Sequence, residues 1–409
     1  MTLDALPSSS PSETPPALMW RGIILIALAV LFASCGACAA LFYLLMPLVS
    51  QRSESISDNI VLGSIALLGG VFGVLTLWQG INIIRGRPSR PAATVFPPTI
   101  VFIVLFALAL TIGTATLAFQ TLAAWLFPLW HFIAASCIPL IFLAYAAHRL
   151  GKTSDFRALF AALSWGVLGV TPIVLVIELA VGAVCILLIA IALMFNPEAR
   201  AILDQMDTRM LLERDPTNLA SVVQILVNPI VIAIVLLYFA VLVPVIEEIF
   251  KTLIIALGDP AQLTRARAIL WGIGAGAGFA LIENIFNTGT LQIVWALAML
   301  MRVGATTMHV INGILMGRGW YAARVERRWS QLGSAFLTSV LVHGLWNAIT
   351  IALGTSLAYA TSNHLFNVTL LTQPLGWFIG ALSIALMALA LGGMLWSVSA
   401  IQAVHEPAS

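Results

Sequence analysis

The sequence predicts an all-α polytopic integral membrane protein, a helix bundle of about ten transmembrane helices with both termini in the cytoplasm. Of the 409 residues, 61% are hydrophobic and only 9% are charged. The mean hydropathy is +1.03, far outside the balance of a soluble domain. The hydrophobic residues fall in runs long enough to cross a hydrocarbon core of about 30 Å as helices. A formal net charge of +2 without a long basic run argues against a nucleic-acid partner.

The polar segment at residues 1–21 is expected to be a disordered tail, because LPSSSPSETPP cannot bury enough apolar surface to fold. An N-terminal membrane region of four helices is expected over residues 22–150. Cys35 and Cys38 form a CxxC inside the first of these helices, where thiols should pack as small apolar side chains rather than form a redox pair. The four predicted crossings are residues 22–48, 60–84, 99–122 and 129–147.

Two later apolar stretches, residues 158–195 and 221–258, are longer than one straight crossing needs. Each could be a single tilted or kinked helix or a re-entrant pair, and the sequence leaves both open. Pro244 removes one helical hydrogen bond just before a pair of glutamates, so we expect a kink there. The polar segment 196–220 has the composition of a loop or a short surface helix.

Four further crossings complete the predicted bundle. The first is glycine-rich, and its Gly274 and Gly278 stand four residues apart, which favours close helix packing over phosphate binding because no strand precedes them. Residues 354–409 are expected to form an external loop, the last transmembrane helix and a C-terminal tail. The remaining three crossings are predicted at residues 291–316, 333–353 and 375–398.

The loop charges predict the orientation of the chain. Four net basic loops alternate with acidic or neutral ones, so the positive-inside rule places all four in the cytoplasm, together with both termini. Loops 51–58, 196–220 and 354–374 are then external. The protein is therefore expected to be a multi-pass protein of a cell membrane. The basic loop residues are Arg85, Arg87 and Arg90, then Arg149, Lys152 and Arg157, then Arg265 and Arg267, and finally Arg318, Arg324, Arg327 and Arg328.

Eight acidic, basic or imidazole residues remain inside the predicted crossings after residue 150, and seven of them lie between positions 247 and 343. A charge at membrane depth costs about 2.5–3.5 kcal/mol even on lenient insertion scales, so these side chains should face inward and have a function. Helical spacing places Glu247 with Lys251 on one face and His343 with Asn347 on another. One cavity lined by four helices could receive all the members of these constellations between positions 247 and 347. The eight residues are Glu178, Glu247, Glu248, Lys251, Glu283, Arg302, His309 and His343.

Carboxylates and imidazoles together suit a divalent ion such as Zn²⁺ with an open position for water. Such an ion activates the water, while a second carboxylate takes the proton and passes it to a leaving amine. Lys251 and Arg302 would hold carboxylates in place or stabilise an oxyanion.

Structural interpretations remain beside this one. Glu247 and Lys251 alone could be a neutralised pair, and His309 or His343 alone could be a packing residue. Asn347 could bond between helices. Glu178 has no companion in its own segment, which favours a structural or proton-path role for it.

Two other classes of protein use buried charges in this way. A transporter or an ion- or proton-conducting protein would form a path with the same residues, although no internal repeat relates the two halves of the chain. A non-catalytic membrane scaffold would bind partners without a metal and would tolerate substitution of the glutamates.

The polar motifs resemble those of the PrsW family of intramembrane proteases, within the larger CAAX protease and bacteriocin-processing superfamily. The pattern comprises EExxK at Glu247–Lys251, FxxxEN at Phe279–Asn284, Arg302 followed by His309, and HGLWN at His343–Asn347. All four elements occur in order on successive predicted helices. The resemblance covers residues 151–353, which are therefore expected to form the protease core.

The resemblance implies a metal-dependent endopeptidase of a bacterial inner membrane that cleaves membrane-embedded or membrane-proximal proteins, such as an anti-sigma factor. Its partners would be that protein or peptide substrate and the lipid bilayer, and no feature of the sequence indicates an oligomeric state. In the CAAX branch the second motif ends in His where Glu283 stands here, so prenyl-protein processing is not expected. By position, the catalytic residues would be Glu247, Glu248, Glu283 and His343, the metal ligands Glu283, His309 and His343, and the supporting residues Lys251, Asn284, Arg302 and Asn347.

Overall fold

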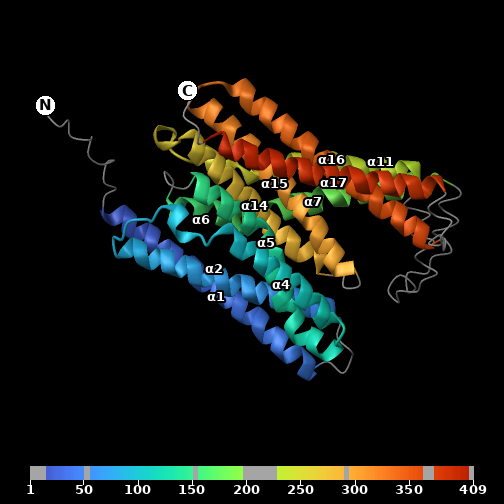
Figure 1. Cartoon of the computed structure of the whole chain (residues 1–409), viewed down its shortest axis with the longest axis horizontal. Helices are drawn as coiled ribbons and strands as arrows, with labels where there is room; N and C mark the ends of the chain where they lie inside the picture. The colour runs from blue at the N-terminus through green and yellow to red at the C-terminus, as the bar shows by residue number, and fades with distance from the viewer. Residues whose placement is uncertain are drawn as a thin grey trace. The chain divides into compact units, whose positions relative to one another are not determined.

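The computed structural model is helical throughout the residues that it describes, with no strand among them (Figure 1). Nine helical runs of this described part are long and apolar enough to cross a membrane. They confirm the predicted all-α polytopic membrane bundle. The predicted crossing at 291–316 corresponds to α15 (Trp295–Arg324), which is not among the nine because Arg302, His309 and Asn312 make it more polar. The described residues are 15–49, 56–150, 155–196, 228–289, 294–362 and 373–404.

Two predicted polar segments, the N-terminal tail and residues 196–220, lie largely outside the described residues. The predicted tail is described only from Pro15, where α1 begins, so the helix starts earlier than the predicted residue 22. The apolar residues of PPALMW continue into the first crossing and extend the helix in this direction. Residues 197–220 of the predicted polar segment 196–220 lie outside the described residues.

The chain divides into two compact units. The first unit comprises residues 1–90, 104–136 and 285–296, and the second comprises the remainder. In the first unit, α1 (Pro15–Val49) packs against α2 (Ile56–Ile84). Parts of α4 (Thr99–Leu117) and α5 (Gln120–Leu150) also belong to it, as do the end of α14 (Arg265–Thr288) and the start of α15.

A buried hydrogen-bonded triad lies in the first unit. The indole Nε1 of Trp295 donates to His131 Nδ1 at 3.0 Å, and His131 Nε2 lies 2.9 Å from the carbonyl oxygen of Ile285. Because an indole N–H can only donate, His131 Nδ1 must accept, and Nε2 carries the proton that it donates to the carbonyl. Both ring nitrogens are therefore satisfied, and the triad links α5 to the start of α15.

The two long apolar stretches form continuous helical runs in the second unit, as far as they are described. Each run contains a π-helical turn directly before the helix that carries its proline: η1 precedes Pro172, and η2 precedes Pro244. The irregularity beside Pro244 is thus a π turn. The first run comprises α6 (Phe156–Ser164), η1 (Trp165–Val170) and α7 (Thr171–Met194), and the second comprises α11 (Pro229–Leu237), η2 (Tyr238–Leu242) and α12 (Val243–Lys251).

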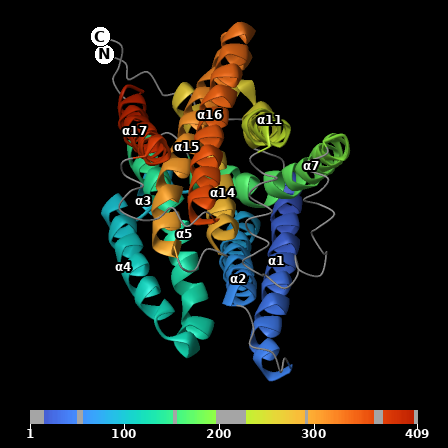
Figure 2. The same cartoon turned by 90° about the vertical axis from the view of Figure 1, so that its right-hand side faces the viewer.

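The remaining long helices of the second unit pack side by side, α14 against α15 and α15 against α16 (Figure 2). Close packing is the role of the predicted glycines: a Cβ on Gly278 would meet the carbonyl oxygen of Leu163, and one on Gly274 would lie 3.1 Å from Leu159. This confirms the packing interpretation of these glycines. The helices are α14 (Arg265–Thr288), α15, α16 (Trp329–Ser362) and α17 (Pro374–Gln402), and the unit also contains the short α3 (Ala92–Val95), α13 (Leu253–Ala256) and η3 (Pro260–Gln262).

Candidate functional site

The helix α12 turns its charged residues inward. Glu247, Glu248 and Lys251 are 3%, 0% and 1% exposed, whereas Ile249 is 43% exposed. This reverses the pattern of a soluble helix and is the arrangement expected in lipid, where charged side chains must face protein or water. Apolar contacts hold this face in place, because Phe279 of α14 packs with Val174 of α7 against α12.

The π turn η2 fixes the position of α12 relative to α16. Asn347 of α16 donates from Nδ2 to the carbonyl oxygen of Phe239 in η2, at 2.9 Å. A Cβ on Gly344 would meet the carbonyl oxygen of Ala240, so the two backbones are in close contact there. His343, next to that glycine, is thereby brought beside the glutamates of α12. Asn347 itself bonds to the backbone of η2, at the edge of the site.

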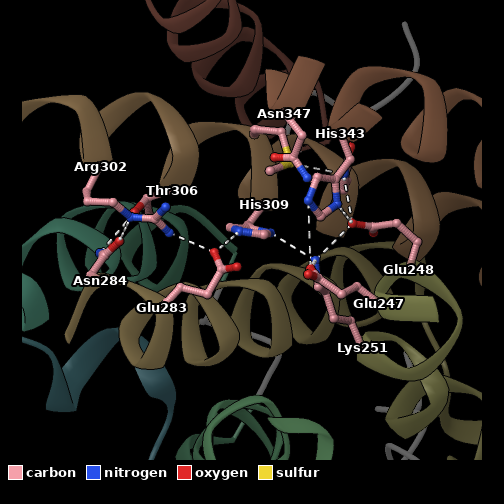
Figure 3. Close-up of polar contacts among 12 residues, drawn as sticks. Glu247, Glu248, Lys251, Glu283, Asn284, Arg302, Thr306, His309, His343 and Asn347 are labelled. Atoms are coloured by element: carbon pink, nitrogen blue, oxygen red, sulfur yellow. Dashed lines mark hydrogen bonds and ion pairs between the residues drawn. The ribbon is translucent and has the colours of Figure 1, made fainter. Parts of the chain in front are cut away.

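Four buried side chains from three helices converge in what we call the four-residue cluster: Glu247, Glu248, His309 and His343 (Figure 3). One ligand atom from each lies within 4.8 Å of those of the others. His343 Nδ1 donates to Glu248 Oε1 at 2.9 Å, and His343 Nε2 lies 3.8 Å from Glu247 Oε2. The two imidazole ring centroids are 5.3 Å apart.

The ammonium group of Lys251 lies among the same atoms. Its Nζ is 2.7 Å from Glu247 Oε2, 2.9 Å from Glu248 Oε1 and 2.9 Å from His309 Nδ1. It also lies 4.5 Å from the ring centroid of Phe279. The i, i+4 pair predicted between Glu247 and Lys251 is therefore present, and the cluster donors hold a cation in this structure.

A second polar chain leads into the cluster from α14 (Figure 3). Arg302 donates from Nη2 to Glu283 Oε2 at 2.7 Å and from Nε to Asn284 Oδ1 at 2.6 Å. The same Glu283 oxygen lies 2.7 Å from His309 Nε2. Because Glu283 is paired with a guanidinium and acts as an acceptor, His309 Nε2 donates to it, and His309 Nδ1 is left as the acceptor for Lys251. Asn284 in turn donates to Thr306 Oγ1 at 3.1 Å.

Two further residues belong to this network and were not assigned to it from the sequence. Asn312 donates from Nδ2 to Glu248 Oε1 at 3.0 Å, and its position three residues after His309 on one helix face was the available signal. Glu178 interacts electrostatically with Glu247, Glu283 and Lys251, so this carboxyl group also faces the cluster. Its companions come from other helices.

The donor set fits a divalent ion. Two carboxylates and two imidazoles are the ligands that Zn²⁺ accepts, and the ammonium already bound by three of them shows that the same atoms attract a cation. Glu283, which the motif comparison includes among the ligands, is not part of the four-residue cluster. Its Oε2 instead contacts Arg302 and His309.

The fold and the site together define a class of protein: a multi-pass helical membrane protein with a buried carboxylate–imidazole cluster. The family model of PrsW family intramembrane metalloproteases matches residues 154–379, more than half of the chain. The chain therefore belongs to the PrsW family. This membership supports a membrane protease function with a divalent metal and a substrate in a membrane setting. No curated protein matches the chain, and no solved structure does.

Proposed function

We propose that the protein is an intramembrane metal-dependent endopeptidase that cleaves membrane-embedded or membrane-proximal segments of other proteins. The observation that carries the proposal is the convergence of Glu247, Glu248, His309 and His343 from three helices within 4.8 Å at a buried site. Groups that are costly to bury are retained in a membrane where they perform chemistry. The regulated first cut of a single-span protein of the anti-sigma-factor kind, in a bacterial inner membrane, is the setting that we propose.

Catalytic zinc sites use three protein ligands and keep a position for water. Glu248, His309 and His343 would hold the ion, which when bound supplies a Lewis acid and an activated water. Glu248 suits this role because Lys251, Asn312 and His343 all donate to its Oε1 and hold the carboxylate in one orientation.

Glu247 would be the general base. It is held by fewer donors than Glu248, so its carboxylate is freer to take a proton from water and to give it to the leaving amine. Glu178 interacts with Glu247 and would complete a path for that proton. Glu283 would act through His309 as a positioning residue, since its oxygen fixes the tautomer and the orientation of that ring.

The experiment is cleavage of a single-span reporter protein in liposomes that contain the purified enzyme. We expect Glu248→Ala, Glu283→Ala and His343→Ala each to abolish cleavage while the protein stays folded. Glu326→Ala is the matched control, because Glu326 is exposed and pairs only with Arg328 among the described contacts. A chelator should stop wild-type cleavage, and added Zn²⁺ should restore it.

Full cleavage by all three variants would overturn the proposal. Ion flux that depends on the buried charged residues, without cleavage of the reporter, would favour the transporter alternative. Protein that neither cleaves nor binds metal, and that is indifferent to the glutamate substitutions, would favour the scaffold.

A further inference from the structure

The ammonium group of Lys251 lies among the atoms that would bind the proposed metal ion. The ammonium contacts three members of the four-residue cluster at 2.7–2.9 Å, and it is 1% exposed. A zinc ion bound to those donors would lie about 2.0–2.2 Å from each of them. The ammonium and the ion would therefore compete for the same small volume.

The competition between the ammonium and the metal ion is most direct at His309. A neutral imidazole has one protonated nitrogen and one nitrogen with a lone pair. His309 Nε2 donates to Glu283 Oε2, so Nδ1 carries the lone pair, and that lone pair accepts from Lys251 Nζ. A single lone pair cannot bind an ammonium proton and a metal ion at once. Metal coordination by His309 Nδ1 thus requires Lys251 to leave that atom.

A displaced ammonium would still have partners. The ring of Phe279 lies 4.5 Å from Nζ, and a cation over an aromatic face is stabilised by the ring quadrupole. The carboxylates of Glu178 and Glu283 also interact with Lys251. A rotation of the flexible lysine side chain toward these groups would keep its charge balanced.

We propose that Lys251 is an internal competitor of the divalent metal: its ammonium occupies the cation position of the four-residue cluster and leaves it when metal binds. This inference rests on the proposed metal site. The lysine lowers the affinity for metal, and whenever the ion is absent its single positive charge offsets part of the negative charge of the two buried glutamates. Loading with metal then includes a side-chain movement of Lys251.

The test is the Zn²⁺ affinity of the purified full-length protein, measured by competition with a chromophoric chelator. Lys251→Met and Lys251→Gln should each bind Zn²⁺ at least tenfold more tightly than the wild type, because no ammonium has to be displaced. Lys251→Gln keeps a hydrogen-bond donor and serves if the methionine variant does not fold. Lys251→Arg keeps the charge and should show no gain. Equal affinity in the wild type and both neutral variants would overturn the proposal.

Two further experiments distinguish a failure of the Lys251 competition from a failure of the proposed metal site. Glu248→Gln should abolish Zn²⁺ binding in the wild-type and Lys251→Gln backgrounds. If Zn²⁺ binding is absent or independent of Glu248, the proposed metal site fails, whatever Lys251 does. A structure of the zinc-loaded protein should show Nζ displaced from His309 Nδ1. Zinc bound at the cluster with that contact intact would refute competition and leave the metal site standing.

Discussion

Substituting Gly276 by alanine tests whether the spacing of α14 and α15 sets the geometry of the site. A Cβ on Gly276 would lie 2.5 Å from the carbonyl oxygen of His309, whereas ordinary contacts begin at 3.4 Å. The difference is 0.9 Å, and a backbone oxygen cannot rotate away as a flexible side chain can. A tilt of α15 that brought it closer to α14 at Gly272 is opposed, because the backbones of Gly272 and Gly313 are already in close contact there. The expected result is a shift of α15 by about 0.9 Å at His309 itself.

A displacement of about 1 Å at a catalytic group can cost about 100-fold in rate, which corresponds to about 2.7 kcal/mol of barrier. We therefore expect Gly276→Ala to cleave the liposome reporter about 100-fold more slowly, and overpacking to lower stability by about 1–3 kcal/mol. Rates are to be measured under single-turnover conditions on protein that elutes as a folded species.

The matched control is Gly354→Ala on α16, the same change at a glycine with no atom within 4 Å of the added Cβ. It should leave cleavage unchanged and can raise stability by up to about 1 kcal/mol through helix propensity. Wild-type cleavage by folded Gly276→Ala protein would show that the close approach of the two helices does not position His309.

Further predictions concern single contacts. Arg302→Met removes the guanidinium from Glu283, and we expect cleavage to fall by about 10–100-fold with partial rescue in Arg302→Lys; unchanged kinetics would exclude a positioning role. Trp295→Phe leaves Nδ1 of buried His131 without its donor, which should cost about 1–3 kcal/mol in a thermal or denaturant melt, and an unaltered melt would refute this. Asp155→Ala removes the side-chain N-cap of α6 and should cost about 1 kcal/mol, whereas Asp155→Asn should be nearly neutral in the same melt.

The fold class followed from the sequence because lipid imposes a simple rule: a crossing must be an apolar run of sufficient length. The same rule explains why α15 is the least apolar of the predicted crossings, since it carries Arg302, His309 and Asn312. The π turns could not be predicted, because the residues of η1 and η2 are as apolar as their neighbours. Only Pro172 and Pro244 indicated that the helices were irregular there.

For the site, helical spacing predicted which residues share a helix face, but it could not predict contacts between helices. Glu248 and His343 are 95 positions apart in the chain, and their hydrogen bond depends on how α12 meets α16. Glu178 shows the same limit, since its partners come only from other helices. The catalytic and metal-binding roles of these residues stay predictions until the variants are measured.

The π turn η2 contains one residue more than an α-helical turn of the same span needs. A single deletion within Tyr238–Leu242 would therefore convert it to an ordinary α turn without turning the helix beyond it. Glu247, Glu248 and Lys251 would keep facing His343. A homologue that lacks one of these residues would retain both the motif and its orientation.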